Sequence, residues 1–272
     1  MEPQWIELDG TVNTRDLGGL PLVGGGTTRS GVLIRSDNLQ ALSDSDVRRL
    51  VDELQVRDVT DLRTDVELKS EGSGPITREP LVEIHHLSLF PEAGQNTDVV
   101  ATEEQEDEDE EAPVVLPWQN QQRDGKGVAG VYRRYLEDRS DSVIQALRVI
   151  AHSDGATIVH CAAGKDRTGT VIALALAEVG VEPDAIIADY AVTAERITAI
   201  MDRLRASSTY ADDLAKMDAK FDGNAIDRHT PRDIGMRRFL DELATDGGAK
   251  VWLREHGWTD GDAAALRAKL IG

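Results

Sequence analysis

Short apolar runs alternating with amphipathic stretches dominate the hydrophobic pattern of the first half of the chain. Apolar runs at 32–34, 56–62, 81–89 and 156–160 predict strands. Ser43 is a predicted helix N-cap, and helical spacing returns over 128–136 and 143–151. Strands that alternate with helices favour an α/β fold, with a central, mostly parallel sheet covered by helices on both faces in three αβα layers.

The second half of the chain is predicted to be almost entirely helical. Thr230 and Pro231 are typical of an N-cap followed by proline at the first helical position. Residues 1–30 show no regular pattern and are expected to be irregular. The predicted helices span 167–179, 183–190, 192–206, 208–218, 231–244, 249–256 and 261–270.

Residues 93–125 interrupt this pattern. The run from Glu103 to Glu111, EEQEDEDEE, holds eight acidic residues in nine positions. Such a segment cannot bury a core and its charges repel one another. We expect a disordered insertion within a single domain over residues 1–272, with a partner-binding segment as the alternative.

The charge balance narrows the classes of partner. Lys and Arg number 30 against 50 Asp and Glu, which gives a net charge of −20. An acidic field disfavours nucleic-acid binding and electrostatic docking on anionic lipid. The single cysteine excludes a disulfide within the chain, and neither an 18-residue apolar run nor a secretory signal is present. We expect a cytoplasmic protein without integral membrane contact, with export lacking a signal peptide left open.

One segment, TIVHCAAGKDRTG at 157–169, carries candidate chemistry. It is predicted to run from a strand through a tight loop into a helix, whose free N-terminal amides and positive potential suit a dianion. Gly164 and two small alanines allow the backbone to close tightly. Arg167 can fork onto phosphate oxygens, and Cys161 lies at the positive end, where a thiolate is favoured. A nucleophilic sulfur below an anion cradle indicates attack on phosphorus.

Three other interpretations of this segment are weaker. A lone buried cysteine is usually inert, but here an arginine follows six residues later and a helix begins directly. A nucleotide-binding loop needs glycine and Ser or Thr where this chain has Val159 and Asp166. A metal site lacks a second thiol at ligand spacing, so we predict neither metal nor cofactor.

The string His-Cys-x5-Arg-Thr-Gly is the signature of the cysteine-dependent protein tyrosine phosphatases. The fuller string HCAAGKDRTG resembles the microbial subfamily of atypical tyrosine phosphatases. The resemblance covers essentially the whole chain and includes NTRDLGG at 13–19, IRSD at 34–37, DLR at 61–63, Gly180-Val181, Asp189-Tyr190 and the C-terminal FLDEL and VWLREHGW. It implies the cysteine-dependent phosphatase fold and hydrolysis of phosphomonoesters.

The resemblance also implies roles for the loop residues. Cys161 would form a phosphocysteine intermediate, and Thr168 would donate its hydroxyl to the Cys161 sulfur. His160 would support the thiolate from behind, with a hydrogen-bonded core histidine as the alternative. Arg167 would hold the phosphate oxygens. The other residues expected to bind them are Ala162, Ala163, Gly164, Lys165, Thr168 and Gly169.

The general acid has two candidates. Better-known tyrosine phosphatases carry an Asp on a Trp-Pro-Asp loop, but here Leu116-Pro117-Trp118 has no acid beside it. Asp166 matches the residue thought to contribute the acid function in this subfamily, and Glu92 is the second candidate. Asp61 is expected to order a turn by accepting from backbone amides.

Several residues are expected to set the substrate range. By resemblance, Lys165 would add a cation for lipid head groups, with a solvated side chain as the alternative. Arg63 would act at the rim or pair at the surface with Asp65 or Glu67. Residues 192–230 resemble a helical lid, and the candidate walls of a phosphotyrosine pocket are Tyr132, Tyr135, Tyr190 and Phe221.

The sequence thus predicts a protein tyrosine phosphatase, with phosphorylated serine, threonine or phosphoinositides as further substrates. A phosphoinositide-preferring phosphatase is the alternative, and a catalytically silent binder of phosphorylated ligands is a second. Reductases that use a cysteine and an anion loop place that loop near the N-terminus, unlike position 161.

Overall fold

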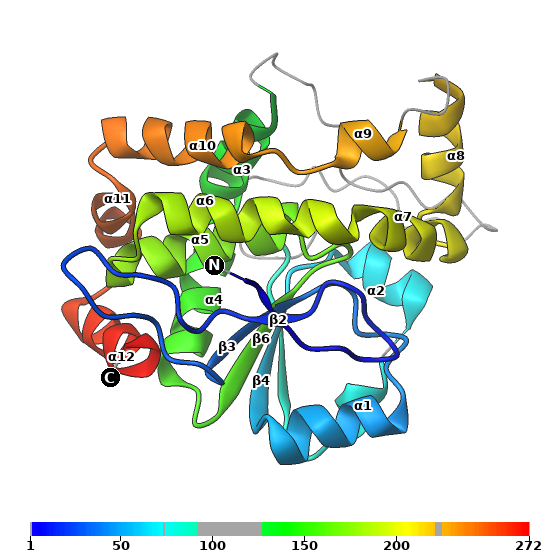
Figure 1. The fold of residues 1–272 in the computed structure, drawn as a ribbon, viewed down its shortest axis with the longest axis horizontal. Helices are drawn as coiled ribbons and strands as arrows, with labels where there is room; N and C mark the ends of the chain where they lie inside the picture. The colour runs from blue at the N-terminus through cyan, green and yellow to red at the C-terminus, as the bar shows by residue number, and fades with distance from the viewer. Residues whose placement is uncertain (1, 73, 92–126, 221–224, 272) are drawn as a thin grey trace, which may run out of the picture.

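The computed structural model describes residues 2–72, 74–91, 127–220 and 225–271, and its described part contains a six-stranded sheet (Figure 1). The strand order is β1-β2-β3-β6-β4-β5. Strands β3, β6, β4 and β5 run parallel, while β1 and β2 extend the sheet antiparallel. The bounds are Gln4–Trp5 (β1), Arg15–Asp16 (β2), Leu33–Ser36 (β3), Val56–Asp61 (β4), Glu83–His86 (β5) and Ala156–His160 (β6).

This sheet confirms the prediction of a central, mostly parallel sheet. The edge strand β5 is shorter than the predicted 81–89, and β1 and β2 lie in a region predicted to be irregular. Two-residue strands leave no alternation of apolar and polar positions to detect.

Helices cover both faces of the sheet and make the three predicted layers (Figure 1). On one face, Ile34, Val59 and Ile158 pack with residues of α1 and of the π-helical turn η1. On the other face, Leu33 and Val159 join the larger core with α3 to α6 and the C-terminal helices. The helical bounds are Asp44–Arg48 (α1), Arg49–Glu53 (η1), Asp65–Glu71 (α2), Pro75–Arg78 (η2), Gly127–Asp138 (α3), Ser140–His152 (α4), Asp166–Val179 (α5), Pro183–Val192 (α6), Thr193–Arg196 (η4), Ile197–Ala206 (α7), Ala211–Lys220 (α8), Ala225–His229 (α9), Asp233–Thr245 (α10), Ala249–Glu255 (α11) and Asp260–Leu270 (α12).

Two helix starts test the capping predictions. Ser43 caps α1, and Asp46 completes a capping box by accepting from the Ser43 amide, as a helix start needs. The predicted start at Thr230-Pro231 is wrong, because the Thr230 amide and hydroxyl both bond to the Ile226 carbonyl and terminate α9. Helix α10 begins only at Asp233.

No described helix is long and apolar enough to span a bilayer. The acidic insertion expected at 93–125 lies outside the described residues.

Candidate active site

The predicted anion loop lies at the carboxyl end of the central strand β6. This strand ends at His160, and α5 begins at Asp166. Cys161 is 2% exposed, directly after the strand. The N-cap position of α5 has no side-chain cap, so no capping side chain covers the first amides of the helix. Gly164 has φ +63°, and a Cβ there would overlap the Ser36 carbonyl of β3, which explains why this position needs glycine.

The backbone carbonyls of loop residues 162–164 all point outward, toward polar groups of neighbouring segments that surround the loop. They accept, in order, from the Asn38 backbone amide (3.1 Å), the Asn13 side-chain amide (2.9 Å) and the Arg35 guanidinium (2.6 Å). In a planar trans peptide, the N–H points opposite to the carbonyl of the same peptide unit. The amides of residues 163–165 are therefore turned toward the concave side of the loop, where an anion would bind.

A buried ion-pair network fixes these loop partners. Asp189 of α6 accepts from the Arg15 Nε at 2.8 Å and from the Arg35 Nη1 at 2.5 Å. Arg15 in turn donates to the Asn13 side-chain oxygen at 2.6 Å. Burial alone would raise the pKa of Asp189, but its attraction to the two arginines outweighs burial and holds that pKa below its usual range. The sequence motifs at 13–19, 34–37 and 189–190 contain these residues, but sequence reasoning gave them no role.

Arg167 lies in a two-point ion pair with Glu67 of α2. Its Nη1 and Nη2 donate to the two Glu67 carboxylate oxygens at 2.6 and 2.9 Å, and Glu67 is fully buried. Glu67 also caps α2 by accepting from the Thr64 amide, and it accepts from the Tyr210 hydroxyl at 2.7 Å. Burial would raise the pKa of Glu67, but attraction to Arg167 lowers it overall. Sequence reasoning missed this pair.

Both predictions for Arg63, a position at the rim of the site and an ion pair at the surface, are wrong. Its side chain is 1% exposed, so it lies neither at a rim nor in a surface ion pair. It pairs instead with Asp61 (2.6 Å) and Glu71 (2.9 Å). A buried guanidinium must be paired to offset its lost hydration, and these two carboxylates supply the pairing.

Asp166, at the first position of α5, is contacted from two sides. Its Oδ1 accepts from the Tyr132 hydroxyl at 2.7 Å, and its Oδ2 lies 3.2 Å from the Lys165 Nζ. Burial would raise the pKa of Asp166, but the Lys165 charge and the Tyr132 hydrogen bond outweigh it and lower that pKa. Lys165 is not a solvated side chain: it is 9% exposed, and its Nζ donates to the His229 carbonyl at 3.0 Å.

His160 and Asp61 lie behind the loop. His160 Nδ1 is 3.3 Å from the Cys161 carbonyl and Nε2 is 3.5 Å from Asp61. Burial lowers the pKa of His160 to about 4, so its imidazole is neutral near pH 7 and matches the alternative of a hydrogen-bonded core histidine. Asp61 accepts from the Arg63 backbone amide at 3.0 Å, which confirms its role in ordering the turn.

Thr168 does not make the expected bond to the Cys161 sulfur. Its buried hydroxyl has no hydrogen-bond partner among the described residues. Gly169 contacts the ring of Tyr190, where a Cβ would come within 3.0 Å of the ring, so it serves helix packing between α5 and α6.

The tyrosines named as pocket walls are core residues. Tyr132, Tyr135 and Tyr190 are all buried, and Tyr132 meets Tyr190 edge to face with ring centroids 6.1 Å apart. Phe221 and Glu92 lie outside the described residues.

The helices after α6 pack over the loop. Ala162 joins Ile197, Met201, Tyr210 and Leu214 in one apolar cluster. The Lys165 bond to the His229 carbonyl adds a contact from α9. Figure 1 shows α7, α8 and α9 together on the side of the molecule that carries α2.

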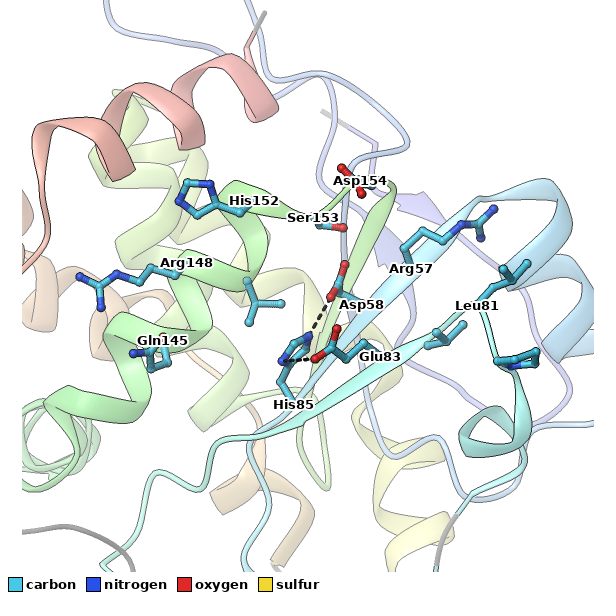
Figure 2. A pocket seen from close by; sticks show the side chains of 13 residues that line it. Arg57, Asp58, Leu81, Glu83, His85, Gln145, Arg148, His152, Ser153 and Asp154 are labelled. Atoms are coloured by element: carbon cyan, nitrogen blue, oxygen red, sulfur yellow. Dashed lines mark hydrogen bonds and ion pairs between the residues drawn. The ribbon is translucent and has the colours of Figure 1, made fainter.

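A separate pocket of about 800 Å³ lies between β5 and α4 (Figure 2). Within the described residues, one group there could hold a metal: potential ligand atoms of Asp58, Glu83 and His85 lie within 4.8 Å of one another. His85 Nε2 is 2.7 Å from the Asp58 carboxylate, and its Nδ1 is 3.9 Å from Glu83. The hydrogen bond between His85 and Asp58 accounts for their proximity, and none of the three residues belongs to the anion loop.

A cysteine thus lies between a central strand and a helix, beside amides turned to the concave side of the loop and an arginine docked on Glu67. A family model described as the tyrosine phosphatase family matches residues 6–272, and the chain belongs to this family. It is 25% identical to the triple specificity protein phosphatase PtpB of Mycobacterium tuberculosis, over 98% of this chain and 99% of that protein. A tyrosine-protein phosphatase of Nostoc commune is 31% identical over 45% of this chain and 42% of its own length. The chain is therefore a phosphatase.

Proposed function

We propose that this phosphatase hydrolyses phosphomonoesters through a phosphocysteine on Cys161, with protein phosphotyrosine as its main substrate. The thiolate attacks phosphorus, and the bond from phosphorus to the leaving oxygen breaks. Asp166 gives a proton to that oxygen. In the second step water attacks the phosphocysteine, Asp166 takes a proton from the water, and inorganic phosphate and the thiolate are released.

The observation that carries this proposal is the outward turn of the loop carbonyls at 162–164. It leaves amides on the side where the equatorial oxygens of a transferring phosphoryl group would lie, and such prearranged donors stabilise the transition state. The Glu67 carboxylate holds the Arg167 guanidinium at the same site. His160, being neutral, would hold the Cys161 carbonyl in place without supplying charge.

The helical region 192–230 would act as a lid, since it contacts both Ala162 and Lys165. Phosphoserine, phosphothreonine and phosphoinositides are further proposed substrates. For phosphoinositides, the supporting observation is that Lys165 places a second cation beside the loop. The name of the M. tuberculosis relative, which refers to triple specificity, also favours a broad range.

Turnover of p-nitrophenyl phosphate with and without vanadate tests the mechanism. We expect vanadate to inhibit competitively, and Cys161→Ser to remove turnover while phosphate still binds. A Cys161→Ser variant that keeps a tenth of the rate would contradict a covalent intermediate. A wild-type protein that binds phosphate without turnover would instead be a silent binder.

A substrate panel then separates the protein and lipid alternatives. Equal concentrations of a phosphotyrosine peptide, a phosphoserine peptide and a short-chain phosphoinositide are compared by phosphate release. We expect the highest kcat/KM on the phosphotyrosine peptide. A higher value on the phosphoinositide would favour the lipid phosphatase.

A further inference from the structure

Tyr132, Tyr190 and Asp166 form a hydrogen-bonded chain with a fixed direction. The Tyr132 hydroxyl lies 2.7 Å from the Asp166 Oδ1 and 2.6 Å from the Tyr190 hydroxyl. An ionised carboxylate can only accept, so the single Tyr132 proton is directed at Asp166. Tyr190 must then be the donor in its bond to Tyr132. Each bond in such a chain polarises and strengthens the next.

Packing keeps this chain in place. Tyr132 on α3 and Tyr190 on α6 are both buried, with exposed fractions of 0% and 2%. The Tyr132 ring also meets Phe239 of α10 edge to face, with centroids 5.7 Å apart. Neither hydroxyl can swing away without moving a helix, so the Oδ1 of Asp166 has a permanent donor.

We propose that Tyr132, backed by Tyr190, is a positioning residue that anchors the Oδ1 of Asp166, leaves proton transfer to Oδ2, and thereby favours aryl over alkyl phosphates. The inference rests on the proposed role of Asp166 as general acid. When Asp166 is protonated, the proton lies on Oδ2, and it passes to the leaving oxygen as the bond to phosphorus breaks. In the second step the same oxygen takes the proton from water.

The contacts of the Asp166 Oδ2 determine when this oxygen can carry a proton. Lys165 Nζ, 3.2 Å away, is a donor and cannot accept the proton of a carboxylic acid. Lys165 must therefore turn to the bound phosphate before Oδ2 is protonated. The two donors favour the carboxylate form of Asp166, in line with its lowered pKa. Protons for the leaving group are then scarce near pH 7, and leaving groups of low basicity, such as phenols, depend least on them.

Tyr132→Phe removes the donor and keeps the ring. The test measures kcat/KM against pH for p-nitrophenyl phosphate, phenyl phosphate and a phosphoserine peptide. We expect the alkaline limb of the profile to move up by about one to two pH units, the shift that corresponds to an ordinary hydrogen bond to a charged group. We also expect the rates on phenyl phosphate and phosphoserine, relative to p-nitrophenyl phosphate, to rise several-fold.

Two variants complete the design. Tyr190→Phe should move the alkaline limb in the same direction as Tyr132→Phe, but by less. It removes the bond from Tyr190 to Tyr132 and leaves the bond from Tyr132 to Asp166 in place. Tyr135→Phe is the matched control: Tyr135 lies on the same helix and is also buried, but in the described structure its hydroxyl makes no hydrogen bond to Asp166. Its alkaline limb should stay at the wild-type pH.

The outcomes separate this inference from the proposed function. A Tyr132→Phe variant that loses rate equally on all substrates, with an unmoved alkaline limb, would overturn the inference and leave a packing role only. In an Asp166→Asn background, Tyr132→Phe should not change the substrate ratios further, because Tyr132 acts through that carboxyl. If Asp166→Asn itself leaves the ratios unchanged, the general-acid assignment has failed, whatever Tyr132 does.

Discussion

Arg167 and Glu67, one hundred positions apart in the chain, form a two-point ion pair with N–O distances of 2.6 and 2.9 Å. The pair joins the N-terminal turn of α5 to α2. Because Glu67 is fully buried, its charge is compensated by this arginine and by the donors that surround it, Thr64 and Tyr210. A guanidinium held from behind in this way has its orientation set before any phosphate arrives.

Glu67→Gln should reduce both activity and stability. Loss of one charge from a buried pair typically costs about 3–5 kcal/mol of unfolding free energy. Displacement of the guanidinium by a fraction of an ångström to about 1 Å is expected to lower kcat by about 10²-fold. Urea unfolding and p-nitrophenyl phosphate turnover measure the two effects, with Arg167→Lys as a comparison that keeps the charge and loses the fork. Full activity in a folded Glu67→Gln variant would show that the loop alone orients Arg167.

Asp166→Asn should lose rate in proportion to the basicity of the leaving group. p-Nitrophenolate, with a conjugate-acid pKa of roughly 7, needs little protonation, whereas the tyrosine phenol at about 10 needs more and serine needs most. On a phosphotyrosine peptide the loss should be about 10²–10⁴-fold, the usual range of general acid catalysis. Steady-state rates on the three substrates check this order. A uniform loss would assign Asp166 to loop geometry and make Glu92 the next residue to test.

Asp189→Asn should destabilise the protein at neutral pH and much less in acid. The pKa of Asp189 in the folded protein lies below the value of about 3.9 in an unfolded chain. Its carboxylate therefore adds stability above about pH 4, and that stability is lost as pH falls through the folded pKa. Urea unfolding at pH 7 and at pH 3 compares the variant with the wild type. A difference in unfolding free energy that is independent of pH would mean that Asp189 acts through shape and not charge.

His160→Gln should make the free energy of unfolding depend less on pH in the acidic range. The folded protein keeps His160 neutral down to a pKa of about 4, whereas the unfolded chain takes up a proton near pH 6.5. The wild type therefore loses up to about 3 kcal/mol as pH falls from about 6.5 to about 4. Thermal unfolding over this range isolates the contribution, with His256→Gln as control, because His256 is exposed and its ring bonds to a backbone carbonyl. If both variants keep the wild-type slope, His160 takes up its proton at the same pH in the folded and the unfolded protein.

The sheet and the loop were predictable because their signals are local. The run at 156–160, the glycine and small residues after it, and the helix that follows lie within one short segment. Ser43 likewise caps the helix that begins beside it. The failure at Thr230-Pro231 shows the limit, because a proline two residues before a helix and one at its first position give the same local pattern.

The partners of the loop were not predictable in the same way. Asn13 reaches residues 163 and 164 across about 150 positions, and Asp189 reaches Arg15 across 174. Many carboxylates and arginines of this acidic chain would satisfy the same chemistry, and only the packed fold selects among them. For Arg63 the sequence favoured neighbours in the chain, Asp65 and Glu67, while the fold turned the side chain inward to Asp61 and Glu71.

The outward carbonyls of residues 162–164 have a consequence for the end of the reaction cycle. Because Asn13, Arg35 and Asn38 hold the loop from outside, the proposed anion site would have the same shape whether or not an ester is attached to the phosphate. Such a site would recognise the dianion itself, so we expect inorganic phosphate to compete with the substrate. Release of the product then competes with the next round of binding, so the free phosphate concentration around the enzyme would set how much of it is available for turnover.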